Sequence, residues 1–230
     1  MVFAHRGAHS RERENTLGAF RDALDIGVEG VELDVRRCVD GALVVHHDPE
    51  VNGVAIAASR ARDLPAYVPH LDAALDVLEG VRVNVEVKNL KDPKEPTYDE
   101  SGEFVGSVID LLRGSRRRSL LELSCFDLAT CVTAHAYDDS IPVSFLTWKV
   151  PLFEALEIAA REGLRGVNPH FLLVSAEAQQ RALNLGLELN VWTVNDAVDL
   201  TAMAELGVRS VITDQPALAV RLLHHGPGPT

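Results

Sequence analysis

The chain has 230 residues, of which 47% are hydrophobic and 24% are charged. This length suffices for a large buried core, and an α/β barrel often occupies it as one domain, so we predict a single domain over residues 1–230. The formal net charge of −12 argues against a nucleic-acid partner, because binding to a phosphate backbone requires a basic face. The one cationic run, at 116–118, is interpreted as a solvated turn.

The cysteines and the apolar segments predict a compartment. Cys38, Cys125 and Cys131 are odd in number and lack metal-like spacing, which indicates free thiols in a reducing environment. No stretch has the apolar length of a membrane span, and the first apolar strand begins at Val2, so we expect neither stable membrane insertion nor a signal peptide. These features together predict a cytoplasmic protein. The oligomeric state stays open.

Apolar runs of strand length alternate with amphipathic stretches of helix length, which is typical of a parallel sheet with crossover helices. In chain order, the expected strands are 2–5, 31–35, 81–88, 120–124, 143–146, 166–168, 189–194 and 210–213. The expected helices are 16–26, 71–78, 103–112, 128–136, 152–161, 176–185 and 197–206. Glycines stand at or just past the ends of most of these helices. This order predicts an α/β fold of the TIM-type (β/α)8 barrel class.

One further apolar run, 42–47, does not fit a parallel barrel. About six residues separate it from the preceding strand, whereas a parallel crossover needs a dozen or more. The run must therefore double back as an antiparallel hairpin, and the turn at 39–41 carries the Asp-Gly pair that hairpins favour. We predict an added antiparallel strand after the second barrel strand, which returns His47 to the neighbourhood of Glu32 and Asp34.

Side-chain alternation places charged residues together inside the barrel. Residues two apart on a strand share a face, so Glu32 with Asp34, and Glu86 with Lys88, are expected to point inward at the C-terminal ends of their strands. Three converging carboxylates repel one another unless a positive charge compensates them. An all-oxygen set suits a hard divalent cation, magnesium or calcium, better than zinc. The alternative is that each carboxylate is held in an ion pair with Arg or Lys.

Short motifs follow one another between residues 4 and 216. They are Ala4-His5-Arg6-Gly7, Glu14-Asn15-Thr16, Glu32-Leu33-Asp34, Asp40-Gly41, His47-Asp48, Glu86-Val87-Lys88, Ser124-Cys125-Phe126-Asp127, Trp192-Thr193-Val194-Asn195 and Thr213-Asp214-Gln215-Pro216. Each motif is weak alone, but the ordered set is specific, and it resembles the glycerophosphodiester phosphodiesterase family. The resemblance implies a TIM-type barrel that uses a divalent cation to hydrolyse glycerophosphodiesters to sn-glycerol 3-phosphate and an alcohol. It also implies metal ligands at Glu32, Asp34 and Glu86, an acid–base pair of His5 and His47, and phosphate contacts from Arg6 and Lys88.

The implied chemistry explains why these residue types are needed. A cation on a non-bridging oxygen lowers the barrier to attack on a phosphodiester anion, while Arg6 grips other oxygens and Lys88 acts as a point charge. A neutral histidine takes a proton from the nucleophile and a protonated one gives a proton to the leaving alkoxide. Which of His5 and His47 does which stays open, as does the choice between direct attack by water and a cyclic phosphate intermediate. Trp192 is either a wall of the substrate pocket or plain core.

Other functions are kept as alternatives. A lysophospholipase D-type phosphodiesterase would use the same site on a lipid substrate, and a non-catalytic phosphate-binding barrel would keep the pocket without turnover. A metal-dependent lyase or isomerase on this barrel would not require paired histidines. Near the motifs, Glu14 and Asn15 are interpreted as capping the first helix, and His46 as a structural or exposed neighbour of His47.

Overall fold

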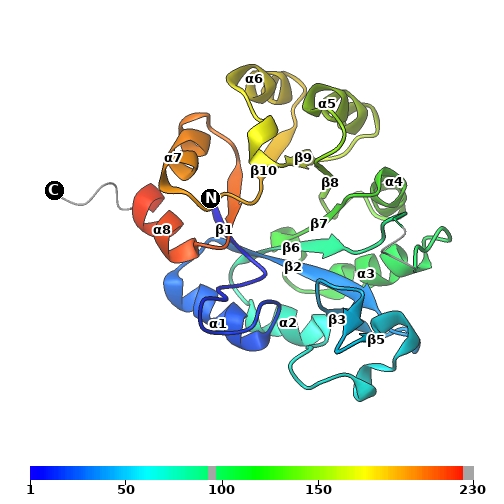
Figure 1. The fold of residues 1–230 in the computed structure, drawn as a ribbon. Helices are drawn as coiled ribbons and strands as arrows, with labels where there is room; N and C mark the ends of the chain where they lie inside the picture. Colours follow the sequence, from blue (N-terminus) through cyan, green and yellow to red (C-terminus); the bar gives the residue numbers. More distant parts are fainter. Residues whose placement is uncertain (93–96, 225–230) are drawn as a thin grey trace.

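The computed structural model describes residues 1–92 and 97–224, which form a closed barrel of parallel strands surrounded by helices (Figure 1). The order around the barrel is β1-β11-β10-β9-β8-β7-β6-β2, and the ring closes because β1 pairs with both β11 and β2. Within the described residues, the eight barrel strands are β1 (Val2–His5), β2 (Gly30–Arg37), β6 (Arg82–Val87), β7 (Leu121–Cys125), β8 (Val143–Thr147), β9 (Gly166–Pro169), β10 (Glu188–Val191) and β11 (Ser210–Thr213). The predicted (β/α)8 barrel is confirmed.

Helices follow the strands and cover the outside of the barrel. They are α1 (Leu17–Ile26), α2 (Leu71–Val77), α3 (Glu103–Gly114), α4 (Leu128–Tyr137), α5 (Leu152–Arg161), α6 (Ala176–Asn184), α7 (Ala197–Glu205) and α8 (Pro216–His224). The first seven match the expected segments to within two residues at each end, and α8 adds a helix that the sequence analysis did not name. No helix in the described part of the chain combines the length and apolar content needed to cross a bilayer.

The start of α1 differs from the prediction. Thr16, not Asn15, is the N-cap, because its side chain accepts a hydrogen bond from the Ala19 N–H. Asn15 has a φ of 57°, a left-handed conformation that asparagine tolerates better than most residues. Its amide then reaches Asp34 on β2 instead of the helix. The interpretation of Asn15 as a cap is therefore wrong.

The predicted hairpin is confirmed. Strand β3 (Leu43–Val45) pairs antiparallel with the end of β2, outside the barrel, in a register that sets Val45 opposite Val35. The turn between them has Gly41 at a φ of 81°, which glycine adopts without strain. Beyond β3, the short strands β4 (Glu50–Val51) and β5 (Val54–Ala55) form a second small sheet. A small apolar cluster separate from the main core supports this region: Cys38, Val44, Val51, Ile56 and Val68.

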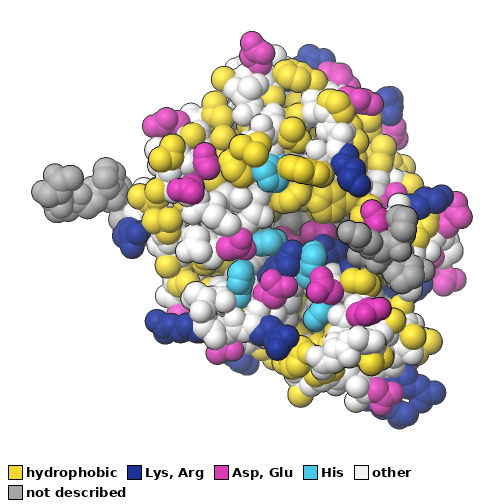
Figure 2. All heavy atoms as spheres, viewed as in Figure 1, with side chains coloured by type: hydrophobic (Ala, Val, Ile, Leu, Met, Phe, Trp, Pro, Cys, Tyr) yellow, Lys and Arg dark blue, Asp and Glu magenta, His cyan; other side chains and the backbone are white. Residues whose placement is uncertain are grey.

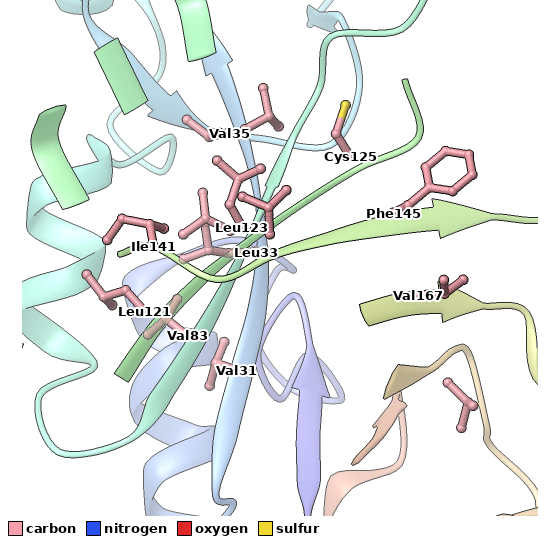
Figure 3. Close-up of a cluster of buried hydrophobic side chains, with 14 of the residues drawn as sticks. Val31, Leu33, Val35, Val83, Leu121, Leu123, Cys125, Ile141, Phe145 and Val167 are labelled. Carbon is pink, nitrogen blue, oxygen red and sulfur yellow. The ribbon is translucent and has the colours of Figure 1, made fainter. Parts of the chain in front are cut away.

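The main core lies between the barrel and its helices, whereas the barrel interior combines many polar side chains with a few apolar ones such as Leu146 and Ile212. Figure 3 shows alternate residues of β2, among them Val31 and Leu33, packed in the apolar cluster. Many of the positions between the apolar ones carry buried polar side chains: Glu32, Asp34, Asn84, Glu86, Glu122, Ser124, Asn168, Asn190 and Ser210. At the N-terminal end of the barrel strands, Arg209 Nη2 donates a hydrogen bond of 2.8 Å to Glu122 Oε2 across the barrel. Period-two alternation therefore directs the acidic residues inward.

The cysteines behave as the sequence predicts. Cys38, Cys125 and Cys131 are all free and buried. Burial also raises the pKa of the Cys38 thiol to about 11, so it remains protonated at neutral pH.

Candidate active site

A cavity of about 200 Å³ opens where the barrel strands end, and Figure 2 shows histidine, acidic and basic side chains gathered around its mouth. This size suits a small polar ligand rather than a drug-sized one. Asp34 lies buried next to Glu32 and Glu86 but is not part of the lining. The cavity is lined by His5, Arg6, Glu32, His47, Asn84, Glu86, Lys88, Phe126, Leu146, Trp192, Thr193 and Ile212.

The three predicted carboxylates converge. Glu32, Asp34 and Glu86 each offer an oxygen, and these oxygens lie within 4.8 Å of one another. The register explains the convergence, because Asp34 on β2 stands directly beside Glu86 on β6. Lys88 Nζ lies 2.8 Å from Asp34 Oδ1 and 2.5 Å from Glu86 Oε1, so two of the carboxylates also form ion pairs. The three carboxylates therefore converge as a metal site requires, and two of them also form the ion pairs that the alternative expects.

Among the three carboxylates, Glu32 is the one without an ion pair to an Arg or Lys side chain in the described residues. Its Oε1 is buried and has no hydrogen-bond partner within residues 1–92 and 97–224. Burial, and then the neighbouring Asp34 charge, raise the pKa of Glu32 above its ordinary value. Although burial opposes ionisation of Asp34 as well, the charges of Lys88 and Arg6 hold its pKa well below the usual range. A divalent cation would supply the partner that Glu32 lacks, so this donor set fits magnesium or calcium.

A tight turn after β1 positions the first motif. Arg6 has a φ of 56° and Gly7 a φ of 83°. A Cβ on Gly7 would lie 2.8 Å from the Ala19 carbonyl carbon, so only glycine lets this turn approach α1 so closely. His5 and Arg6 therefore stand at the cavity edge on a backbone held in place by α1.

Arg6 is tied to the acidic residues around it. Its backbone N–H donates to Glu32 Oε2 over 3.1 Å, and its Nη1 donates to Glu14 Oε1 over 2.9 Å. Its Nε lies 3.3 Å from Asp34 Oδ2. Glu14 is therefore a partner of Arg6 rather than a helix cap, which corrects the interpretation made from the sequence. These contacts fix the guanidinium plane beside the carboxylate cluster.

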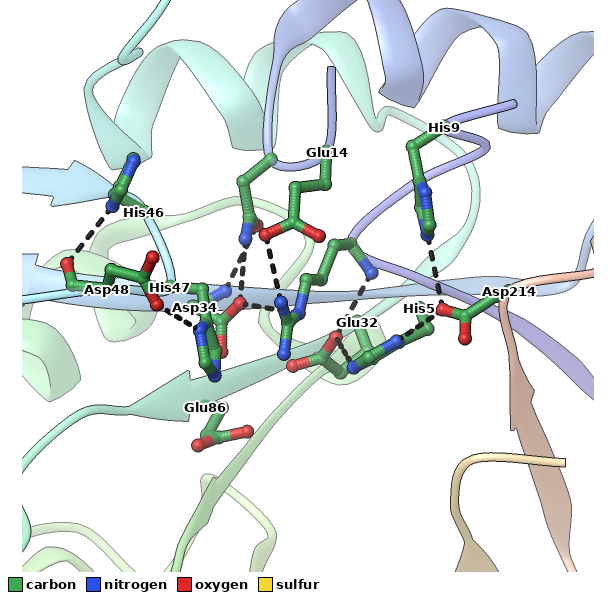
Figure 4. A network of polar contacts seen from close by, with 12 residues as sticks. His5, His9, Glu14, Glu32, Asp34, His46, His47, Asp48, Glu86 and Asp214 are labelled. Carbon is green, nitrogen blue, oxygen red and sulfur yellow. Dashed lines mark hydrogen bonds and ion pairs between the residues drawn. The ribbon is translucent and has the colours of Figure 1, made fainter. Parts of the chain in front are cut away.

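His5 is oriented by Asp214, a residue to which the sequence analysis gave no role. His5 Nδ1 lies 2.6 Å from Asp214 Oδ1, and His5 Nε2 lies 3.9 Å from Glu32 Oε2 (Figure 4). Although burial opposes protonation, the hydrogen bond to Asp214 and the charge of Glu32 raise the pKa of His5. The only signal in the sequence was the Thr-Asp-Gln-Pro motif, whose contact with His5 spans 209 residues of chain.

His47 approaches from the hairpin, and its pKa is shifted in the opposite direction from that of His5. Its Nδ1 lies 2.8 Å from Asp48 Oδ1, and its backbone carbonyl accepts a hydrogen bond of 2.9 Å from Arg36 Nε. Burial and the nearby Lys88 charge lower the pKa of His47. The site therefore presents two histidines of which His5 favours the charged form and His47 the neutral form.

Trp192 is held firmly and still faces the cavity. Its Nε1 donates to the Asn168 carbonyl over 2.7 Å, and its ring meets Phe126 edge-on with centroids 5.4 Å apart. The side chain is partly exposed and belongs to the cavity lining. It is therefore a wall of the pocket rather than plain core.

Comparisons with known proteins identify the family of the chain. The model of the "Glycerophosphoryl diester phosphodiesterase family" matches residues 5–218. The "Glycerophosphodiester phosphodiesterase" of Caldanaerobacter subterraneus subsp. tengcongensis is 25% identical over 251 residues, covering 98% of each chain. A crystal structure of a glycerophosphodiester phosphodiesterase from Parabacteroides distasonis has a TM-score of 0.84 at 23% identity and covers 97% of this chain and 96% of that one. An Oleispira antarctica phosphodiesterase, solved in complex with the product sn-glycerol-3-phosphate, has a TM-score of 0.83 at 22% identity and covers 94% of each chain. The chain belongs to the glycerophosphoryl diester phosphodiesterase family, a family of phosphoric diester hydrolases.

Proposed function

We propose that this protein hydrolyses glycerophosphodiesters to sn-glycerol 3-phosphate and an alcohol, with a divalent cation and a pair of histidines. The observation that carries the proposal is that one small cavity is flanked by an undercompensated carboxylate cluster and by two histidines of opposite protonation tendency. The product bound to the Oleispira relative supports a substrate of this class. The assigned residues are His5 and His47 in acid–base catalysis, Arg6, Lys88 and Trp192 in substrate binding, and Glu32, Asp34 and Glu86 as ligands of magnesium or calcium.

The cationic side chains serve two purposes in this scheme. Arg6 and Lys88 line the cavity and also balance Asp34, so they bring positive charge to the place where a phosphate would bind. The guanidinium of Arg6 suits two phosphate oxygens at once, whereas the ammonium of Lys88 acts as a point charge. A bound divalent cation would neutralise the charge that builds on a non-bridging oxygen during attack.

The protonation tendencies divide the work between the histidines. Between the two pKa values, His5 is protonated and His47 is neutral, because Asp214 and Glu32 favour the charge on His5 while burial and Lys88 disfavour it on His47. His47 is then the base that takes a proton from the attacking hydroxyl. His5 is the acid that gives a proton to the leaving alkoxide.

Two alanine variants test this assignment. His5→Ala and His47→Ala should each lower kcat by about 10²-fold or more and leave the affinity for magnesium or calcium nearly intact, since neither is a proposed ligand of that ion. A nitrophenyl phosphodiester, whose leaving group needs no proton, should rescue His5→Ala far more than His47→Ala. His46→Ala, next in the chain but outside the cavity lining, is the matched control. Equal rescue of both variants would contradict the assignment of His5 as the acid and His47 as the base.

Product analysis separates the alternatives. The purified protein is incubated with glycerophosphocholine, glycerophosphoethanolamine or lysophosphatidylcholine, with and without chelator, and glycerol 3-phosphate, lysophosphatidate and free head group are assayed. We expect glycerol 3-phosphate from the first two substrates, in a reaction that chelator stops and magnesium or calcium restores. Lysophosphatidate as the main product would indicate the lysophospholipase D-type alternative. Binding without turnover would indicate a non-catalytic barrel, and full turnover in excess chelator would exclude the metal.

A further inference from the structure

A second group of potential metal ligands lies at the rim of the cavity, beside the carboxylate cluster. His5, His9 and Asp214 each offer one ligand atom, and the three atoms lie within 4.8 Å of one another. Asp214 Oδ1 is 2.6 Å from His5 Nδ1 and 3.2 Å from His9 Nε2 (Figure 4). Zinc bonds of about 2.0–2.2 Å in a tetrahedral site separate neighbouring ligand atoms by about 3.3 Å. Small side-chain adjustments therefore suffice to admit the ion.

The carboxylate of this group is held in the orientation that a ligand needs. Asp214 Oδ2 accepts a hydrogen bond of 2.8 Å from Asn195 Nδ2, and the Asp214 N–H donates to Asn195 Oδ1 over 2.8 Å. Asn195 thereby turns Oδ1 toward both imidazoles, in the way that outer hydrogen bonds orient metal ligands. The side chains of His5, His9 and Asp214 are 18%, 25% and 28% exposed, which leaves a path for an ion and for water as a fourth ligand.

We propose that His5, His9 and Asp214 form a zinc site distinct from the carboxylate cluster, and that zinc bound there inhibits the enzyme. Two imidazoles and one carboxylate are ligands that zinc accepts readily, whereas magnesium and calcium prefer oxygen alone. The all-oxygen carboxylate cluster therefore favours magnesium or calcium, whereas the set of His5, His9 and Asp214 favours zinc.

Inhibition follows from the position of the proton on His5, and this part rests on the proposed acid role of that residue. Zinc bonds to Nδ1, and a ring that was protonated releases the Nδ1 proton to solvent while it keeps the proton on Nε2. The zinc-bound ring is a weaker acid than imidazolium, because the Zn–N bond withdraws less electron density than the N–H bond it replaces. Its Nε2 has no lone pair in the ring plane and cannot act as a base either. Both possible catalytic roles of His5 are therefore lost.

A different route to zinc inhibition must be separated from this one. Zinc generally binds a given site more tightly than magnesium, so it could displace magnesium from Glu32, Asp34 and Glu86. Inhibition by that route would weaken as magnesium is raised and would not respond to changes at His9. The test is therefore carried out at saturating magnesium.

The test compares His9→Gln with the parent protein. Glutamine keeps a hydrogen-bond donor for Asp214 but removes the imidazole ligand, and His9 has no proposed part in catalysis, so basal activity on glycerophosphocholine should be retained. The zinc concentration for half-inhibition should rise by about tenfold or more. His46→Gln, a nearby histidine outside the group, should leave zinc sensitivity unchanged. Equal zinc sensitivity of His9→Gln and the parent would overturn the proposal.

Zinc calorimetry of the magnesium-saturated protein gives a readout independent of activity. We expect a binding event in the parent and in His46→Gln that is lost or weakened about tenfold or more in His9→Gln. Absence of that event in the parent would overturn the site, and binding without inhibition would overturn the inhibitory role. If the parent protein hydrolysed no glycerophosphodiester and still bound zinc through His9, the proposed function would fail while the zinc site stood.

Discussion

Replacement of Asp214 by asparagine tests whether His5 acts as the acid. Burial opposes the charge on His5, and the 2.6 Å hydrogen bond from its Nδ1 to Asp214 is a main reason that its pKa is nevertheless raised. Asparagine keeps the shape and one acceptor oxygen but removes the negative charge. A hydrogen bond to a charged group contributes about 1.5–3 kcal/mol, and one pKa unit corresponds to about 1.4 kcal/mol. The pKa of His5 should therefore fall by about one to two units.

The sign of the effect on activity follows from the acid role. His5 must carry a proton to protonate the leaving alkoxide, so activity is lost as the pH rises through its pKa. Asp214→Asn should move the alkaline limb of the kcat/KM profile to lower pH by about one to two units, while the acid limb, set by His47, stays in place. Initial rates on glycerophosphocholine between about pH 5 and about pH 9 measure both limbs. An NMR titration of the His5 ring checks the shift without turnover.

Asp48→Asn is the matched control, because Asp48 pairs with His47 in the same way. Its side chain is 71% exposed, and exposed ion pairs contribute only about 0–1 kcal/mol. The acid limb should therefore move to lower pH by less than about 0.7 unit, with no change in the alkaline limb. An alkaline limb in Asp214→Asn that coincides with that of the parent would refute the assignment of His5 as the acid.

Three further outcomes concern stability and the cation. Magnesium or calcium at about 100 times its Kd should raise the Tm by about 5–10 °C, measured by scanning calorimetry. Because the folded-state pKa of Glu32 is raised, the cation-free protein loses stability as the pH rises through that pKa. The rise in Tm on cation binding should therefore be larger at about pH 8 than at about pH 5.5, and it should be absent in Glu32→Gln. Lys88→Met leaves two buried carboxylates without their shared partner and should lower the free energy of unfolding by about 3–5 kcal/mol, and an unchanged urea midpoint would contradict the ion-pair geometry. Gly7→Ala puts a Cβ on a residue with a φ of 83°, 2.8 Å from the Ala19 carbonyl carbon, and should lower the free energy of unfolding by about 1–3 kcal/mol. A thermal transition equal to that of the parent would show that the turn relaxes freely.

The sequence by itself determined most of the secondary structure and the inward-facing charges, because both depend on neighbours along the chain. The predicted strand at 210–213 and helix at 152–161 coincide with β11 and α5. The short link before 42–47 was enough to require an antiparallel hairpin. The strand expected at 189–194 ends earlier, at Val191, and is followed by an isolated parallel bridge between Trp192 and His170.

Only the tertiary structure decided which charges meet. Asp214 reaches His5 and His9 because barrel closure sets β1 beside β11, a contact between distant parts of the chain that no local pattern encodes. Asn15 similarly crosses to Asp34 rather than capping its own helix. The opposite pKa shifts of the two histidines, and the buried Glu32 Oε1 without a hydrogen-bond partner in the described residues, arise from burial and from neighbours distant in sequence. A residue's type states which charges it can carry, but the free energy of carrying one depends on the solvent it loses and the partners it gains on folding.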